Sequence, residues 1–279
     1  MRISNYEHHL GAQNESIRGW IDAERINGAA LGHTENRMSP TVFLLPGLAC
    51  DARVWREAIP PLLAAGHRVQ VSDVHVRFDS LAGMAAALLA EAGREPLVLV
   101  GTSMGGMLAL EVWRLAPERV SALALLGTTA RPDTPEMIRL RSEACELFAQ
   151  GRVDEVLRAN IAFALHSGHA RLAELVADYL AMVRRAGAEA LIRQNRAVMA
   201  RPDYRPLLPN IRCPVLVMCG EDDLLTPVEC SREIASAVPG AALDILPRCG
   251  HLLTMECGER VGSSIATWLA GVEAAPPTA

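Results

Sequence analysis

The chain has 279 residues, of which 50% are hydrophobic and 21% charged, and its formal net charge is −5. This composition supports a sizeable core and excludes global disorder, while the lack of any basic stripe or Lys/Arg run argues against a nucleic-acid-binding protein. The 7 cysteines include no C-x-x-C pair, which argues against a zinc site or a disulfide framework, and no apolar stretch approaches the length of a membrane span.

The first part of the chain differs in composition from the rest. Residues 1–39 are polar and show no strong periodicity, so we expect an N-terminal extension that is either flexible or folded as a short helix or edge element. The opening MRISNYEHHL lacks the apolar core of a signal peptide. Together with cysteines that are best interpreted as reduced thiols, this favours a cytoplasmic location.

From residue 41 onwards, strands and helices alternate along the chain. Predicted strands cover residues 41–45, 67–72, 96–100, 122–126, 214–219 and 242–246, and predicted helices cover 51–65, 80–92, 104–115 and 259–270. Nearly continuous apolar strands are typical of a parallel sheet that is covered on both faces. We therefore predict an α/β fold with a mostly parallel central sheet, formed by residues 40–130 and 210–272 and followed by a tail at 273–279.

The stretch at residues 131–209 breaks this alternation. It contains no convincing strand, and apolar residues recur at helical spacing, for example Leu172, Leu175 and Met182. Proline-rich segments bracket it on both sides. We predict that these residues form a helical cap inserted between two strands of the sheet.

The segment GTSMGG at 101–106 is the most informative motif. It places Ser103 in a G-x-S-x-G arrangement between the predicted strand 96–100 and the predicted helix 104–115. A strand that turns sharply into a helix exposes the middle side chain at the carboxyl edge of a sheet, beside backbone N–H groups. Ser103 is therefore a candidate nucleophile.

A serine nucleophile needs a base within hydrogen-bond reach and a carboxylate that orients the base. Two later strands run into segments that supply these groups. GEDDLLTP at 220–227 contains Asp222 and Asp223, and PRCGH ends in His251. Because the carboxyl ends of parallel strands meet at one edge of the sheet, we expect these side chains to approach Ser103. The chain order Ser, Asp, His is the one expected for this nucleophile turn.

The motifs GTSMGG, GEDDLLTP and GH resemble those of the α/β-hydrolase family, and the resemblance covers roughly residues 41–269. It implies that Ser103 is the nucleophile, that His251 takes its proton and later activates water, and that Asp223 orients His251. The family pattern G-x-x-D followed by a proline selects Asp223 over Asp222. Asp133 remains a rival, since some family members place the acid after the preceding strand.

The segment LPGLACDARVW at 45–55 looks like the oxyanion loop of the family, with Pro46 where histidine often stands. The resemblance implies that the backbone N–H groups of Leu48 and Met104 form the oxyanion hole. Cys50 lies beside this loop, but no motif positions a base for it, so we interpret it as a non-catalytic thiol.

Two features depart from the family pattern. The long β-hairpin that usually precedes the oxyanion strand is not visible in residues 1–39, and SDVHVRFDS at 72–80 replaces the pattern D-x-x-G-x-G-x-S. We therefore expect a compact sheet that lacks one or two edge strands. Neither departure affects the predicted catalytic residues.

The resemblance implies hydrolysis of a small or medium carboxylic ester, lactone or thioester through an acyl-enzyme, with no metal or organic cofactor. It leaves open a C–C bond hydrolase, an acyltransferase, a cofactor-free haloperoxidase and a triad-retaining small-molecule receptor or signalling protein. The oligomeric state is not indicated. His166 and His169 are interpreted as residues of a solvated loop. One of six arginines in the predicted cap is a candidate for binding a substrate carboxylate: Arg139, Arg141, Arg184, Arg185, Arg193 and Arg196.

Overall fold

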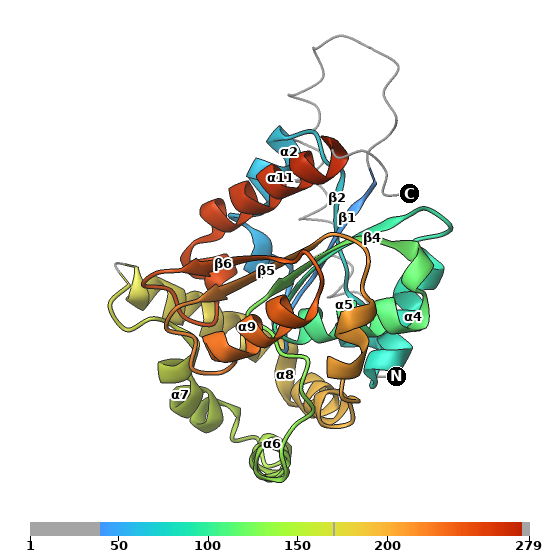
Figure 1. The fold of residues 1–279 in the computed structure, drawn as a ribbon. Coiled ribbons are helices and arrows are strands. Elements are labelled where there is room, and N and C mark those ends of the chain that lie inside the picture. The colour runs from blue at the N-terminus through green and yellow to red at the C-terminus, as the bar shows by residue number, and fades with distance from the viewer. Residues whose placement is uncertain (1–39, 170, 275–279) are drawn as a thin grey trace. The chain divides into compact units, whose positions relative to one another are not determined.

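The structure is a computed structural model that describes residues 40–169 and 171–274 (Figure 1). In this part of the chain, 6 parallel strands form one sheet in the order β2-β1-β3-β4-β5-β6. The strands are β1 (Val42–Leu45), β2 (Val69–Val71), β3 (Leu97–Thr102), β4 (Val120–Leu126), β5 (Val215–Gly220) and β6 (Ala242–Leu246). The predicted α/β fold with a parallel sheet is confirmed.

Helices cover both faces of the sheet (Figure 1). One face carries α2 (Ile59–Ala64) and α11 (Gly258–Ala274), and the other carries α4 (Leu81–Glu91), α5 (Met104–Leu115) and α9 (Val228–Ala237). Shorter helical segments are η1 (Ala52–Trp55), α3 (Val74–Arg77), η2 (Pro117–Arg119), η3 (Arg205–Asn210) and α10 (Leu253–Glu256).

The alternation of side chains along β3 explains why its sequence is apolar throughout. Leu97 and Leu99 pack into the core layer formed with α4 and α5, whereas Val98 and Val100 pack into the layer formed with α2 and α11. All four side chains are buried. A strand that is buried on both faces requires apolar residues at consecutive positions.

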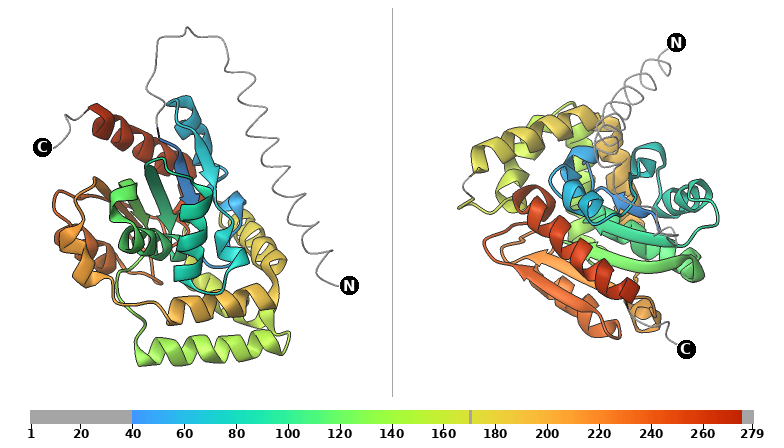
Figure 2. Two further views of the ribbon diagram at one scale, coloured as in Figure 1. Left: turned by 90° about the vertical axis from the view of Figure 1, so that its right-hand side faces the viewer. Right: turned by 90° about the horizontal axis from the view of Figure 1, so that it is seen from above.

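Three longer helices lie between β4 and β5, and we call them the inserted helices: α6 (Pro135–Ala149), α7 (Val153–Ala164) and α8 (Leu172–Met199). They fall within the range predicted for the cap, and they lie together at the bottom of Figure 1 and of the left view of Figure 2. Helix α8 is interrupted at Gly187, which has φ 77° and ψ 165°. A non-glycine residue would be strained in this conformation.

The region predicted as one helix at 51–65 contains two segments. Asp51 caps η1 by accepting a hydrogen bond from Arg53 N–H at 2.9 Å, but a turn separates η1 from α2. Pro60 and Pro61 lie in the first turn of α2. Proline is tolerated in the first turn of a helix, but it has no N–H to donate and its ring clashes with a preceding helical turn, which explains why α2 begins here rather than continuing from η1.

Two other boundaries differ from the prediction. The segment 72–80 contains the helix α3, which no periodic pattern indicated. Helix α11 extends to Ala274, so it includes the first two residues of the predicted tail at 273–279. The predicted extension at 1–39 and residues 275–279 lie outside the described residues. No helix in the described part of the chain has both the length and the apolar character that a membrane span requires.

Candidate active site

The candidate nucleophile occupies a strained turn between a strand and a helix. Ser103 follows the last residue of β3 and precedes the first residue of α5, with φ 53° and ψ −117°. Such a backbone conformation is uncommon for a residue with a side chain, so its neighbours must hold it. Ser103 N–H donates to Leu126 O at 2.8 Å, and Thr128 Oγ1 donates to Ser103 O at 2.7 Å. The end of β4 and the loop after it therefore stabilise the turn.

The glycine at position 105 lets this turn pack against the end of β1. A Cβ atom on Gly105 would lie 2.0 Å from Leu45 O and 2.8 Å from Pro46 O, so no larger residue fits. Strands β2 and β3 pair with opposite sides of β1, which means that the strand order reverses here. Ser103 thus lies at the topological switch point, where open α/β sheets bind their ligands.

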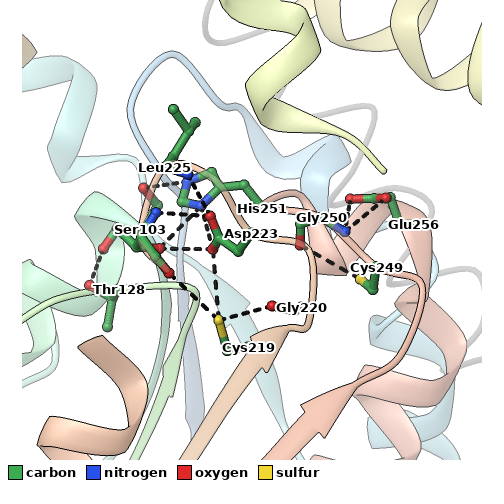
Figure 3. A network of polar contacts seen from close by, with 11 residues as sticks. Ser103, Thr128, Cys219, Gly220, Asp223, Leu225, Cys249, Gly250, His251 and Glu256 are labelled. Atoms are coloured by element: carbon green, nitrogen blue, oxygen red, sulfur yellow. Dashed lines mark hydrogen bonds and ion pairs between the residues drawn. The ribbon is translucent and has the colours of Figure 1, made fainter. Parts of the chain in front are cut away.

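Figure 3 shows that the side chains of Ser103, His251 and Asp223 form one hydrogen-bonded chain. His251 Nε2 lies 3.0 Å from Ser103 Oγ, and His251 Nδ1 lies 2.8 Å from Asp223 Oδ2. An ionised carboxylate only accepts hydrogen bonds, so His251 Nδ1–H donates to Asp223. In the neutral imidazole, Nε2 is then the acceptor for the Ser103 hydroxyl. This arrangement permits proton transfer from the serine hydroxyl to the imidazole.

The carboxylate of Asp223 is buried and has several donors. Its Oδ1 accepts from the N–H groups of Leu225 and Thr226 at 2.9 and 2.8 Å, and its Oδ2 accepts from Thr226 Oγ1 at 2.8 Å. Burial alone would raise the pKa of Asp223, but the charge and hydrogen bond of His251 and the donors of Thr226 lower it below its ordinary value. Sequence reasoning did not identify Thr226, although it belongs to the GEDDLLTP motif.

The two rival acids bind other partners. Asp222 Oδ2 lies 3.2 Å from Nδ1 of His166, and Asp222 is exposed. Asp133 is buried and forms ion pairs with Arg201 at 2.7 Å and with Arg141 at 2.8 Å. Among these three acids, therefore, Asp223 is the one that the structure joins to His251.

The two N–H groups expected in the oxyanion hole have no hydrogen-bond partner within the described residues. Leu48 N–H belongs to the loop after β1, and Met104 N–H belongs to the first residue of α5. The first N–H groups of a helix lack intrahelical acceptors and carry the positive end of the helix dipole. Both groups are therefore available to an acceptor, and their assignment to the oxyanion hole stays a prediction.

Sequence reasoning also missed Glu256, whose buried carboxylate connects the His251 loop to the inserted helices. It accepts from Gly250 N–H at 3.1 Å and from His166 N–H at 2.8 Å. Burial raises the pKa of Glu256, and these two N–H donors oppose the increase. Nε2–H of His169 donates to Glu256 O at 2.9 Å. We expected a solvated loop here. His166 and His169 are half-buried loop residues, and both are joined to Glu256: His166 through its backbone N–H and His169 through its imidazole.

The arginines that were candidates for a substrate carboxylate have protein partners in most cases. Arg139 and Arg141 pair with Glu143 and Asp133 at 3.1 and 2.8 Å. The partners of the remaining arginines are Asp154 for Arg184, Asp51 for Arg185 and Val76 O for Arg193, while Arg196 is exposed. Five of the six side chains therefore already have a protein partner.

The cysteines are free thiols, and burial suppresses the reactivity of the one beside the oxyanion loop. Burial, with the nearby charge of Asp51, raises the pKa of Cys50 to about 12. A thiol with such a pKa carries almost no thiolate at neutral pH. No group of three or more His, Cys, Asp or Glu side chains within residues 40–169 and 171–274 is arranged to hold a metal ion.

A cavity of about 340 Å³ is lined by residues of η1, α8 and α10 and of the turn after η1. Its lining includes Arg53, Arg185, Met182 and Thr254, and it does not include Ser103. This cavity is therefore not the candidate catalytic site.

Comparison with known proteins supplies a family match. A family model described as alpha/beta hydrolase fold matches residues 40–256. The chain is 28% identical over 260 residues to the "Putative non-heme bromoperoxidase BpoC" of Mycobacterium tuberculosis, covering 88% of this chain and 99% of the relative. It is 30% identical over 244 residues to the "Putative carbamate hydrolase RutD" of Caulobacter sp. (strain K31), covering 83% and 91%.

A solved structure of a thermophilic esterase from Thermogutta terrifontis, with malate bound, resembles this chain with a TM-score of 0.75. The two proteins are 28% identical, and the match covers 84% of this chain and 91% of the esterase. These relatives have different named activities, so likeness alone does not select a substrate.

Proposed function

Because the chain belongs to the alpha/beta hydrolase fold family, we propose that it is a serine hydrolase that cleaves a small or medium carboxylic ester, lactone or thioester. The observation that carries this proposal is the hydrogen-bonded chain from Ser103 through His251 to Asp223. Ser103 is the proposed nucleophile, His251 the general base and acid, and Asp223 the group that orients the imidazole and stabilises the imidazolium.

In the proposed acylation step, Ser103 Oγ attacks the carbonyl carbon while His251 Nε2 takes the hydroxyl proton. The carbonyl π electrons move to the oxygen, which becomes an oxyanion. When this intermediate collapses, the bond to the leaving group breaks, and the leaving alcohol takes the proton from His251. In deacylation, a water molecule gives its proton to His251 and attacks the acyl group on Ser103. The second collapse returns the proton to Ser103 Oγ and releases the acid.

The N–H groups of Leu48 and Met104 are the proposed donors to the oxyanion. Fixed donors stabilise charge in the transition state without reorganisation, and removal of one donor typically costs about 3–4 kcal/mol in the barrier. Their lack of partners among the described residues supports this role.

We further propose that residues 131–209 act as a cap that selects the substrate. Two contacts support a cap at the catalytic edge: His166 N–H with Glu256, and Ala49 N–H with Gln194. Leu225 is 42% exposed and lies beside His251 in Figure 3, which supports contact with an apolar part of the substrate. Since most arginines of the inserted helices already have partners, an uncharged acyl group fits better than a dicarboxylate.

Carbamate hydrolysis is the second candidate, and the 30% identical relative of that name favours it. The same nucleophile would attack a carbamate carbonyl, so the chemistry differs in the leaving group and in the stability of the acyl-enzyme.

A substrate panel tests the proposal and separates the alternatives. Purified protein and Ser103→Ala are assayed with p-nitrophenyl acetate and butyrate, a thioester, a lactone and an aryl carbamate. We expect turnover of an ester, lactone or thioester that Ser103→Ala lacks. Preferential carbamate turnover would select the second candidate. Transfer of the acyl group to an added alcohol would indicate an acyltransferase. Halogenation that depends on peroxide would indicate a haloperoxidase. Thermal stabilisation by a ligand without turnover would indicate a receptor.

A further inference from the structure

We propose that Gln194 of α8 is a positioning residue for the oxyanion hole. The inference rests on the proposed function, because it assigns Leu48 N–H to the oxyanion. Gln194 would act through the turn formed by residues 47–50, which contains Leu48 and which we call the oxyanion turn. Neither the G-x-S-x-G motif nor the acid and histidine motifs include this glutamine, and it comes from an element about 145 residues further along the chain.

The oxyanion turn contains a strained residue that needs external support. Ala49 has φ 64°, a left-handed conformation that residues with a side chain rarely adopt. Inside the turn, Cys50 N–H donates to Gly47 O at 3.2 Å. The other two polar contacts come from outside: Ala49 N–H donates to Oε1 of Gln194 at 2.8 Å, and Nε2–H of His75 donates to Cys50 O at 2.8 Å.

The side-chain amide of Gln194 is fixed at both ends. It is 1% exposed, and its Nε2 donates to His75 O at 3.0 Å while its Oε1 accepts from Ala49 N–H. A flipped amide would place its oxygen against the carbonyl of His75 and its NH₂ group against the N–H of Ala49. Each hydrogen bond therefore fixes the orientation required by the other, and the amide bridges the oxyanion turn and α3.

The segment at residues 72–80, which departs from the family pattern, supplies the groups that bind Gln194 and the oxyanion turn. It forms the short helix α3, whose last carbonyls have no intrahelical donors. Gln194 and Arg193 of α8 donate to two of them, His75 O and Val76 O. Because a backbone carbonyl only accepts hydrogen bonds, Nε2–H of His75 is the donor to Cys50 O, and burial lowers the pKa of this imidazole.

Displacement of the turn would affect the oxyanion site without breaking the catalytic hydrogen-bonded chain. The turn is close to the nucleophile, since a Cβ atom on Gly47 would lie 3.3 Å from Ser103 Cβ. Leu48 lies between Gly47 and Ala49, so the direction of its N–H follows the conformation that Gln194 holds. Gln194 is not a hydrogen-bond partner of Ser103, His251 or Asp223. Its loss should therefore impair stabilisation of the transition state more than binding of the substrate.

The test compares Gln194→Met with the wild type on the best ester of the panel. Methionine keeps most of the side-chain length and removes both hydrogen bonds. We expect kcat to fall about 10- to 100-fold while KM changes less than about threefold. The Ki of an alkylboronic acid, whose adduct with Ser103 carries an oxygen in the oxyanion hole, should rise by a similar factor. A purely structural role for Gln194 would not move kcat and this Ki in parallel at constant KM.

Arg193→Met is the matched control. It removes a hydrogen bond between the same two helices but does not contact the oxyanion turn, so kcat, KM and the boronic acid Ki should stay within about threefold of the wild type. If Gln194→Met does not fold, as judged by circular dichroism, Gln194→Glu replaces it, because a carboxylate of the same length cannot donate to His75 O as the amide does. The same kcat and Ki changes are expected.

The outcomes separate this inference from the proposed function. If the wild type is active and the folded position 194 variant keeps the wild-type kcat and Ki, the role of Gln194 is overturned while the serine hydrolase assignment stands. A similar loss in Arg193→Met would also overturn it, since general loosening of α8 would then explain the effect. A wild type that neither turns over the panel nor binds the boronic acid at Ser103 would overturn the proposed function, and this inference with it.

Discussion

Nδ1–H of His251 donates to Oδ2 of Asp223 at 2.8 Å, and the two side chains are only 7% and 0% exposed. Water therefore competes little for this hydrogen bond, and the imidazole keeps one tautomer. The relationship distinguishes Asp223 from its neighbour Asp222, whose carboxylate faces His166 at the surface.

Asp223→Asn should reduce kcat by about 10⁴-fold without unfolding the protein, because an amide favours the wrong tautomer of His251. The measurement is steady-state turnover of the best ester, with circular dichroism as the check on folding. Asp222→Asn is the matched control and should retain turnover within about threefold. Equal losses in the two variants would contradict the assignment of the acid.

Thr226→Val should weaken the support of Asp223 without removing the acid. The hydroxyl donates to Asp223 Oδ2 at 2.8 Å, and valine has the same shape with no donor. Loss of a hydrogen bond to a buried charged group costs about 1.5–3 kcal/mol, so the unfolding free energy should fall by this amount. Urea denaturation measures the change. A variant as stable as the wild type would show that this hydrogen bond contributes nothing to the net stability.

Asp133→Asn should destabilise the protein while leaving the chemistry of the folded fraction intact. Asp133 and Arg201 form an ion pair at 2.7 Å with side chains 0% and 1% exposed, and removal of one partner leaves a buried charge. Such changes cost about 3–5 kcal/mol. Chemical denaturation gives the loss of stability, and active-site titration gives turnover per folded molecule. If turnover per active site falls as far as in Asp223→Asn, Asp133 is the catalytic acid instead.

His75 should make the stability depend on pH around the ordinary histidine range. Burial lowers its pKa in the folded state, with Asp51 and Asp73 opposing the shift and Arg77 adding to it. Below the unfolded pKa of about 6.5, the unfolded chain binds a proton that the folded protein does not, so stability falls as the pH decreases. His75→Phe lacks this component. Urea denaturation at about pH 7.5 and about pH 5.5 should therefore show that the free energy of unfolding decreases more for the wild type than for His75→Phe. Equal decreases in the two proteins would contradict a contribution of His75 to this pH dependence.

Much of the fold was predictable because local patterns report on it directly. The apolar runs identified the strands, and the turn at Ser103 fell between β3 and α5 as predicted. The acid and the histidine were predictable as a pair because both follow strands of a parallel sheet, and the register aligns Gly220 of β5 with Leu246 of β6. The chain therefore reaches Asp223 and His251 from the same edge.

The features that could not be predicted from the sequence depend on contacts between distant segments of the chain. Gln194 and Ala49 are 145 positions apart, and Glu256 and His166 are 90 apart, so no local pattern joins either pair. Helix α3 has only 4 residues, too few to establish a helical period. The break between η1 and α2 was readable from Pro60 and Pro61, which lie inside the range predicted as one helix.

The central claim is that Ser103 forms a covalent acyl-enzyme, and intact-protein mass spectrometry with a fluorophosphonate tests it most directly. We expect one adduct per wild-type chain, located by peptide mapping on the fragment that contains Ser103, with loss of ester turnover in proportion to labelling. Ser103→Ala should remain folded, unlabelled and inactive. An adduct on another residue, or ester turnover that persists in Ser103→Ala, would contradict the account.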